Sequence, residues 1–389
     1  MRRSVLLLAI VVEGGCGSST RSSHAQTVEV VPARATPLDV GSSAPPSARP
    51  ESPVQIVLGL GPLCARVEGR VFCATLDPET VLASEANAIA GIDDATSLVV
   101  GQSFACVTTR RGTVKCFGDN TFGQLGAKFG GERSVEPLEV VGIGNADRVM
   151  AGPFHACALL ADKSVRCWGR NEHGQTGSDT IHLPEARELV SATVVPNVQA
   201  RDVALSFGST CAVSTDRTVV CWGEPQSDGS KVAGRNERPK ALDGLSDMDT
   251  VVGSESGFCA VRRGKVSCWG DLRGLVKGAG PGDNVATVPG LDDAKRVRVA
   301  SDHGCAVLGD GRVACFGYPY SRALGGATDE SGYDAVPAAI VEGLSSVVDV
   351  TVSPGLSCAL TRDRALYCWG QWYAGSIRVE PKPIRFRLQ

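Results

Sequence analysis

Fourteen of the fifteen cysteines in this chain form seven pairs, and no other feature limits the possible folds as strongly. The members of a pair are nine or ten positions apart, and the first member recurs at intervals of 42 to 54 residues. The pairs are Cys64 and Cys73, Cys106 and Cys116, Cys157 and Cys167, Cys211 and Cys221, Cys259 and Cys268, Cys305 and Cys315, and Cys358 and Cys368. A motif that recurs at roughly 50 residues is typical of a solenoid or a propeller. We therefore expect one large domain built from repeats.

The spacing within a pair fits a β-hairpin. A three-residue loop at Ala161–Lys163 places Cys157 opposite Cys167. In the pairs that are one residue closer, a two-residue loop such as Arg263–Gly264 restores the opposition, and glycine suits the positive φ of that turn. Opposed residues of a hairpin lie at disulfide distance, so the sequence predicts seven hairpin disulfides. Zinc sites favour close C-x₂-C knuckles, which do not occur here.

Other positions keep phase with the cysteines. An aromatic residue followed by glycine comes directly after the second cysteine at Phe117, Trp168, Trp222, Trp269, Phe316 and Trp369. A small residue stands five positions before each first cysteine, at Gly59, Gly101, Gly152, Ser206, Ser254, Ala300 and Ser353. We expect the aromatic residues to pack in the core between neighbouring units, and the small residues to allow close backbone approach.

Each unit contains four short strands, as in the segments RPKAL, MDTVVG, GFCAV and KVSCWG around Cys259. Seven such units predict an all-β, seven-bladed β-propeller over residues 54–389, with one hairpin disulfide per blade. The first unit begins at Val54–Gly59 and lacks one strand, which Pro383–Leu388 resembles. We therefore expect the N- and C-terminal strands to pair in the blade of Cys64 and Cys73, which would close the ring.

The N-terminus has the layout of a signal peptide, with a basic start, an apolar run from Val5 to Val12 and small residues around Cys16. It resembles a bacterial lipoprotein signal, in which the cysteine after the cleavage site is lipidated. Glu13 departs from the apolar residue that this motif prefers, and an ordinary cleavage after Ser23–Ala25 is the alternative. We expect residues 1–16 to be the signal with its lipidation cysteine. Residues 17–53, which are rich in Pro, Ser and Ala, would then be a tether.

The stretches "GPFHACALLADKSVRCWGRNEHGQTG" and "CFGDNTFGQLG" resemble repeats of the regulator of chromosome condensation family. The resemblance covers residues 54–389, and later units keep the Cys-Trp-Gly core but lose the "GQLG" tail. It implies a seven-bladed propeller. The eukaryotic founder of the family exchanges nucleotide on a small nuclear GTPase, whereas exported bacterial members are mostly binding proteins. A shared fold does not transfer function.

The sequence offers little chemistry. Lys plus Arg (39) nearly balance Asp plus Glu (42), without the basic stripe of a nucleic-acid binder. The motifs G-x-S-x-G and H-E-x-x-H and the P-loop do not occur. His155 and His303 stand two residues before a repeat cysteine, where packing is favoured over catalysis. Acidic pairs such as Asp93–Asp94 fit turns better than calcium sites. We expect no catalytic residue, cofactor or metal.

The tails that follow each Trp-Gly or Phe-Gly differ between units and should gather on one rim of the propeller. Their candidate binding residues are Asn120, Phe122, Arg170, His173, Tyr318, Tyr320, Trp372 and Tyr373. Aromatic residues next to arginine match the composition of interface hot spots, although Trp372 and Tyr373 could instead pack on the closing strand.

The predicted function is therefore that of an exported, lipid-anchored, monomeric scaffold that binds a protein or an envelope macromolecule. It would reside in the bacterial cell envelope or be secreted, would meet the membrane only through its anchor and would not bind nucleic acid. One alternative is an envelope hydrolase or lyase with a site built from several blades. The other is a GTPase exchange factor, which export and disulfides argue against.

Overall fold

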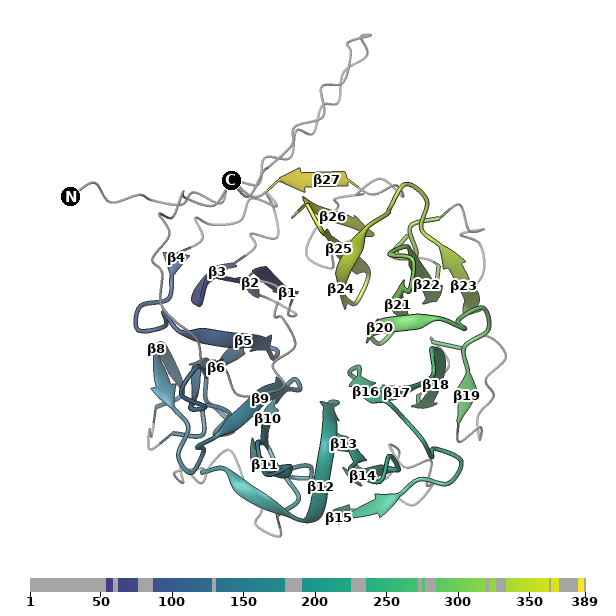
Figure 1. The fold of residues 1–389 in the computed structure, drawn as a ribbon. Helices are drawn as coiled ribbons and strands as arrows, with labels where there is room; N and C mark the ends of the chain where they lie inside the picture. The colour runs from purple at the N-terminus through teal and green to yellow at the C-terminus, as the bar shows by residue number, and fades with distance from the viewer. Residues whose placement is uncertain are drawn as a thin grey trace, which may run out of the picture.

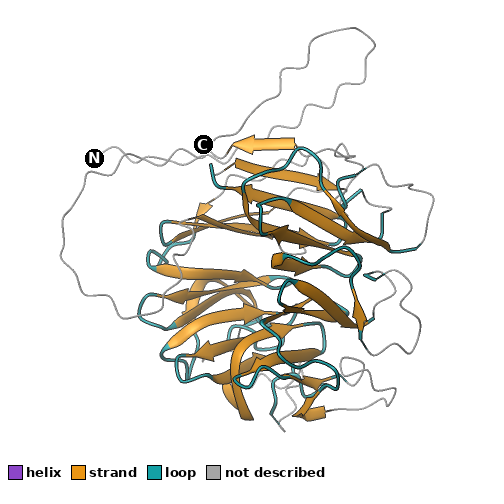
Figure 2. Cartoon of the chain, turned by 45° about the vertical axis from the view of Figure 1, so that its right-hand side comes forward, coloured by secondary structure: helices purple, strands orange, loops and turns teal. Residues whose placement is uncertain are grey.

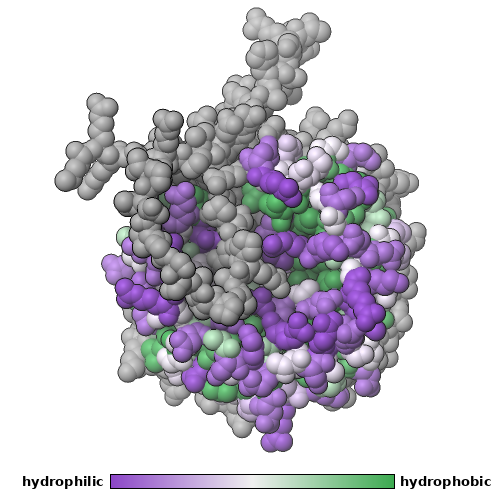
Figure 3. Space-filling model, in the orientation of Figure 1, coloured by the Kyte–Doolittle hydropathy of each residue, from purple (hydrophilic) through white to green (hydrophobic). Residues whose placement is uncertain are grey.

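The computed structural model describes residues 54–58, 62–75, 87–127, 131–178, 191–224, 236–271, 275–276, 285–319, 322–326, 334–363, 365–370 and 384–387. These residues form an all-β structure without a helix (Figure 2). Within that part of the chain there is accordingly no helix long and apolar enough to cross a bilayer. Among the described residues on the face seen in Figure 3, hydrophilic ones predominate, with smaller hydrophobic areas between them.

The strands follow one another in antiparallel sheets that are each built from consecutive strands. The first two sheets are β1 (Val54–Leu58), β2 (Pro62–Val67), β3 (Arg70–Thr75), β4 (Asn87–Ala88), and β5 (Ala95–Val100), β6 (Phe104–Thr109), β7 (Val114–Asp119), β8 (Arg133–Glu139). A seven-stranded sheet contains β9 (Ala146–Ala151), β10 (His155–Leu160), β11 (Ser164–Gly169), β12 (Thr193–Leu205), β13 (Ser209–Ser214), β14 (Val219–Gly223) and β15 (Asn236–Ala241).

Three further sheets complete the described fold. They are β16 (Thr250–Gly253), β17 (Gly257–Arg262), β18 (Lys265–Gly270), β19 (Ala286–Thr287); β20 (Ala294–Val299), β21 (His303–Leu308), β22 (Val313–Gly317), β23 (Val336–Ile340); and β24 (Val347–Ser353), β25 (Leu356–Thr361), β26 (Ala365–Gly370), β27 (Ile384–Arg387). The seven-stranded sheet exists because β12 is long enough to serve two sets of strands. Thr193 to Gln199 pairs with β11, and Ala200 to Leu205 pairs with β13.

The innermost strands surround a common centre (Figure 1). Each of β1, β5, β9, β12, β16 and β20 contacts the next innermost strand, and the last one, β24, contacts β1. The sheets therefore have the radial arrangement of a propeller. The first and last innermost strands, β1 and β24, meet by packing side by side. They are not joined through a shared sheet, since none of the described sheets contains strands from both ends of the chain.

This arrangement corrects the predicted ring closure. β27 pairs with β26, where Cys368 lies opposite Ile384, and does not join the sheet of Cys64 and Cys73. The short strand β4 takes the outer place in that first sheet, where Asn87 lies opposite Cys73. The predicted strand order within a unit was wrong for the same reason, since the RPKAL segment in β15 pairs with the preceding β14.

A buried anchor explains where each sheet ends. Between an outer strand and the next inner strand, the chain passes a glycine with positive φ and then a buried Ile or Leu. Gly142 has φ +84°, and Ile143 packs in a cluster with residues of both neighbouring sheets. The buried side chain fixes the segment that connects the outer strand of one sheet to the innermost strand of the next. The Gly-Ile and Gly-Leu dipeptides therefore mark the boundaries between sheets.

The predicted hairpins and their disulfides are present. In every pair the two cysteines are directly opposed across the second and third strands, and their Cα–Cα distances are 3.9 to 4.2 Å. The disulfides join Cys64 to Cys73, Cys106 to Cys116, Cys157 to Cys167, Cys211 to Cys221, Cys259 to Cys268, Cys305 to Cys315 and Cys358 to Cys368. All fourteen predicted pairing partners are therefore confirmed.

The turns of these hairpins follow the predicted loop lengths. The two-residue turn at Arg263–Gly264, between Cys259 and Cys268, has φ values of +50° and +85°. These values match the primed turn that suits a tight hairpin. The shorter spacing of this pair is thus compensated by a tighter turn, and the cysteines remain opposed.

The tryptophans that follow the second cysteines are buried, as predicted. Trp168, Trp222 and Trp369 also donate their indole N–H to a backbone carbonyl in the preceding tail, at distances of 2.7 to 2.9 Å. The small residues permit close approach of neighbouring innermost strands, because a Cβ on Gly152 would lie 2.7 Å from the carbonyl oxygen of Ser206. Adjacent sheets are thus joined by both apolar packing and hydrogen bonds.

Candidate functional site

One face of the propeller collects two kinds of loop. The first and third strands of a set run in the same direction, because consecutive strands are antiparallel. The turn from the first to the second strand and the tail after the third strand therefore lie on the same face. Hydrogen bonds join the two loops of a sheet. The N–H groups of Asp119, Arg170 and Glu224 donate to carbonyls of residues 103, 154 and 208 at 2.8 to 3.0 Å. We call this side the tail face, defined by turns 101–103, 152–154, 206–208, 254–256, 300–302 and 353–355 and tails 120–126 and 170–177.

An arginine among three phenylalanines is the most distinctive feature of the tail face. The guanidinium carbon of Arg170 lies 5.2 Å from the ring centroid of Phe122, 5.4 Å from that of Phe154 and 5.1 Å from that of Phe207. The rings also contact one another, with Phe154 at 5.3 Å from Phe122 and at 5.0 Å, edge to face, from Phe207. The four side chains come from three successive sets of strands, so only the assembled propeller creates this Arg–Phe cluster.

The Arg–Phe cluster holds a positive charge on an apolar surface. Arg170 forms an ion pair with Glu172, and its side chain is 16% exposed. Cation–π contacts stabilise a guanidinium over aromatic faces, most strongly where water is partly excluded. Phe207 is 41% exposed, so one ring of the cluster is open to a partner.

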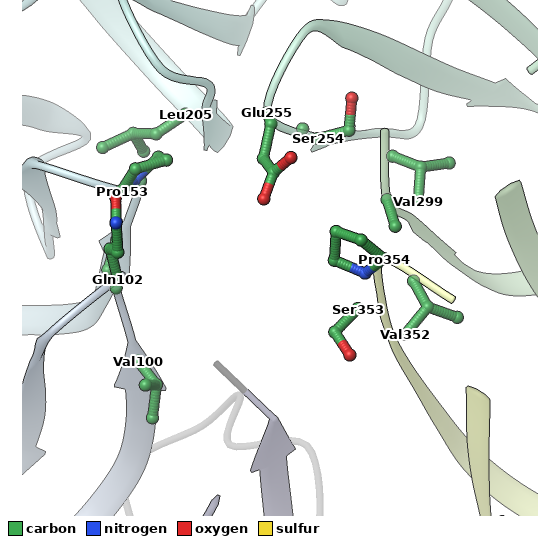
Figure 4. A pocket seen from close by; sticks show the side chains of 15 residues that line it. Val100, Gln102, Pro153, Leu205, Ser254, Glu255, Val299, Val352, Ser353 and Pro354 are labelled. Atoms are coloured by element: carbon green, nitrogen blue, oxygen red, sulfur yellow. The ribbon is translucent and has the colours of Figure 1, made fainter. Parts of the chain in front are cut away.

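A pocket of about 150 Å³ opens at the centre of the same face, where the inner strands end. Its walls include Val100, Leu205, Val299 and Val352, and Figure 4 shows the Glu255 side chain pointing into the space between them. Burial raises the pKa of the Glu255 carboxyl above its usual value, and the nearby charge of Asp302 raises it further, against a hydrogen bond from Ser301.

The pocket and the Arg–Phe cluster are connected. The N–H of Phe207 donates to the carbonyl oxygen of Glu255 at 3.1 Å, and Pro153, next to Phe154, lines the pocket. A partner that covers Phe207 would therefore also reach the pocket entrance.

Two buried histidines link neighbouring sets of strands beneath this face. His155 Nε2 lies 2.8 Å from Thr210 Oγ1, which donates to the carbonyl of Gln175. The same carbonyl also accepts the indole N–H of Trp222. Complete burial, followed by the charge of Arg170, lowers the pKa of His155 to about 3, so the ring is neutral.

The second histidine has the hydrogen-bond partners of a hydrolytic triad. His303 Nδ1 lies 2.8 Å from Asp302 Oδ1, and its Nε2 lies 2.8 Å from Ser357 Oγ. In a serine hydrolase the hydroxyl proton is directed to the histidine and the hydroxyl faces the substrate. Here Ser357 has no exposed surface, and its hydroxyl donates to the carbonyl of Ala323 at 2.8 Å. The trio links two sheets, whereas His155 and Thr210 link two sets of strands within the seven-stranded sheet.

The structure separates the predicted rim residues into different roles. Phe122 and Arg170 come together in the Arg–Phe cluster. Asn120 folds its own tail, since its side-chain oxygen accepts from the N–H of Leu125 and its amide donates to Gly131 O. His173 and Tyr318 also follow third strands, and the N–H of Tyr318 donates to Asp302 O, as the other tails do. Tyr320, Trp372 and Tyr373, like Cys16, lie outside the described residues.

Sequence reasoning missed Phe154, Phe207 and Glu255. All three lie in the turns between inner and second strands, just after the small residue that allows close packing of neighbouring sheets. A signal was present, because the residue directly after the small one varies widely between units, as Gln102, Pro153, Phe207, Glu255 and Pro354 show.

The acidic pairs lie away from the tail face in side-chain interactions of their own. Arg217 binds Asp247 through Nε at 2.7 Å and Asp249 through Nη2 at 2.8 Å. Among the described residues, no group of three His, Cys, Asp or Glu side chains could hold a metal ion.

Comparison with known proteins agrees with the repeat pattern. The model of the regulator of chromosome condensation (RCC1) repeat matches residues 95–124 and 148–175. The human E3 ubiquitin-protein ligase HERC2 is 28% identical over 240 residues, which cover 56% of this chain but 5% of HERC2. Protein pim1 of Schizosaccharomyces pombe is 25% identical over 223 residues, covering 52% of this chain and 41% of pim1. The chain thus matches less than two thirds of the length of these relatives.

Solved structures share the fold at low sequence identity. Yeast RCC1 (Prp20), in its complex with Kap60, has a TM-score of 0.63 and 16% identity, covering 90% of this chain and 91% of Prp20. Human WBSCR16 has a TM-score of 0.63 and 20% identity, covering 77% of this chain and 84% of that protein. The chain therefore carries repeats of the regulator of chromosome condensation (RCC1) type on a propeller fold.

Proposed function

We propose that this protein is a scaffold that binds a protein partner through its tail face. The observation that carries the proposal is the Arg–Phe cluster, in which Arg170 contacts three phenylalanine rings and Phe207 remains 41% exposed. Aromatic and arginine side chains grouped on a rigid surface are the usual anchors of protein interfaces. Disulfide-linked hairpins beneath the cluster keep these anchors in place before a partner arrives, which reduces the entropy lost on binding.

The partner class is supported by the structural neighbours. Yeast RCC1 (Prp20) has been solved in complex with Kap60, and its binding to Gsp1p and histones has been characterised. For the present chain we propose a protein or an envelope macromolecule as partner, a monomeric state and no nucleic-acid ligand. We propose a binding role rather than an enzymatic one, because the Asp302–His303–Ser357 trio is buried and its serine proton is engaged by a carbonyl.

We also propose seven blades, export and a lipid anchor at Cys16, with residues 17–53 as tether and 54–389 as propeller. The seven innermost strands and seven hairpin disulfides of the described residues support the blade number. Disulfides persist in oxidising compartments, which supports export. The signal layout around Cys16 supports the anchor. Incorporation of labelled fatty acid by the full chain, and its loss in Cys16→Ala, is the test of the anchor.

The test of binding compares three forms of the oxidised full chain. Wild type, Phe207→Ala and Val135→Ala would be immobilised and exposed to envelope and secreted proteins of the producing cell. Val135 is the matched control, because it is 77% exposed but lies on the outer strand β8. We expect a protein that wild type and Val135→Ala retain and Phe207→Ala releases. Equal retention by all three would remove the tail face from the proposal.

A further inference from the structure

The central pocket of the tail face has one charged wall in an otherwise uncharged lining. Of the fifteen described residues that line it, Glu255 alone carries an ionisable side chain. Valine, leucine and proline side chains also line the pocket, and its lining residues come from the ends of six innermost strands and the turns that follow them. The pocket therefore combines an apolar wall with a single carboxylate.

The carboxyl group of Glu255 is more than half buried, and it forms no ion pair with any cation among the described residues. Partial burial raises its pKa, and the charge of Asp302 acts in the same direction. A carboxylate that has lost hydration without gaining a cation is a strong acceptor for a positively charged ligand.

The backbone of the pocket offers little to an anion. The N–H groups of Gly101, Gly152 and Ser254 donate to the carbonyls of residues 104, 155 and 257 at 2.8 to 2.9 Å. The N–H of Gln102 donates to Pro153 O, and the Ser254 hydroxyl donates to Gly257 O at 3.1 Å. These five donors are thus used within the protein, and the ligand that fits the valines, the leucine and the carboxylate of the lining is a cation with an apolar stem.

We propose that the central pocket receives a lysine side chain of the protein partner, with its ammonium group at Glu255. The inference rests on the proposed binding through the tail face, and it adds the chemistry that the partner must present there. The methylene groups of lysine can lie against apolar side chains of the lining, since long basic side chains bury their stems while the charge meets a polar group. Phe207 then covers the flanking surface of the partner.

The pocket can be tested without the partner. Nα-acetyl-lysine N-methylamide would be titrated into the disulfide-bonded full chain and followed by NMR shifts of pocket residues. Nα-acetyl-norleucine N-methylamide, which keeps the stem and lacks the ammonium group, is the control ligand. We expect millimolar binding of the lysine probe and at least about tenfold weaker binding of it to Glu255→Gln, which keeps the shape and removes the charge. Equal binding of the norleucine probe, unchanged affinity in Glu255→Gln or no shifts at all would overturn the inference.

Two variants separate this inference from the proposed function. Phe207→Ala should release the partner protein but bind the lysine probe as wild type does, because Phe207 is not part of the pocket lining. Glu255→Gln should fold normally, as judged by its urea midpoint, and lose both the probe and most of the partner affinity. If the partner depends on Phe207 and is indifferent to Glu255→Gln, the binding function stands and the lysine pocket falls. If the probe binds as described and no partner depends on Phe207, the pocket stands and the proposed function falls.

Discussion

The buried His155 should make folding stability depend on pH in a measurable way. Its pKa is 6.5 when unfolded and about 3 in the folded protein, because burial and then the charge of Arg170 disfavour the imidazolium. Between these values the unfolded chain binds a proton that the folded chain does not, so stability is full above pH 6.5 and falls as the pH drops toward 3. Lowering the pH from 7 to 5 should remove about 2 kcal/mol from the free energy of unfolding through this residue.

The assay is urea unfolding of wild type and His155→Gln at pH 7, 6 and 5 with the disulfides intact. Glutamine does not titrate and can still donate to Thr210 Oγ1, which His155 Nε2 contacts at 2.8 Å. The difference between the two proteins cancels the other titrating groups that they share. We expect this difference to shift by about 2 kcal/mol in favour of His155→Gln between pH 7 and 5. A shift below about 0.5 kcal/mol would refute the reasoning, since it would mean that the folded protein takes up the proton almost as readily as the unfolded one.

Three further predictions concern stability and the triad-like trio. Trp222→Phe removes the indole N–H that Gln175 O accepts and should lower the free energy of unfolding by about 1–3 kcal/mol in urea. Gly126→Ala should destabilise more than Gly91→Ala in thermal melts, because both have positive φ but only at Gly126 would a Cβ meet a neighbour, 2.7 Å from Trp168; equal melting temperatures would contradict this. Ser357→Ala should lower the urea midpoint and leave any hydrolysis of ester substrates by the purified protein unchanged, whereas a loss of such hydrolysis would restore the enzymatic alternative.

Features that repeat along the chain could be predicted because they are local. Opposition of Cys157 and Cys167 follows from the ten-residue spacing and the three-residue loop, and neither depends on the rest of the fold. Burial of Trp168 follows from its fixed phase and size. The strand order could not be read in the same way. A four-strand repeat looks the same whether the outer strand opens or ends a unit, and pairing of β15 with β14 is decided by packing of the buried Leu245 between sheets.

The candidate site was only half predictable for a related reason. Phe122 and Arg170 follow third strands, and that shared position predicted that they would lie on one face. Their contact depends on the rotation from one sheet to the next, which no local pattern encodes. Phe207 reaches Arg170 from a third set of strands for the same reason. Glu255 was missed because a single carboxylate in a turn acquires meaning only when six strand ends enclose it.

The tails divide into a part that holds the propeller together and a part that is free to vary. Asn120 and Asn171 each accept a backbone N–H five positions ahead, and Gln124 and Gln175 fold back on the tail in the same way. The carbonyls of the same two glutamines accept the indole N–H of the next tryptophan, so these residues close each tail onto the next sheet.

When the two tails are aligned at these fixed positions, Asp119 stands where Arg170 does, directly before the asparagine, and Phe122 stands where His173 does. Substitution at those places changes what the tail face presents, and it leaves in place the backbone carbonyls that accept the indole N–H groups of Trp168 and Trp222. A propeller built this way can acquire a new partner by changing Arg170 or Phe122, with loss of the cation–π contacts that these two side chains make. Loss of Asn171 or Gln175, by contrast, should disturb the fold before it disturbs recognition.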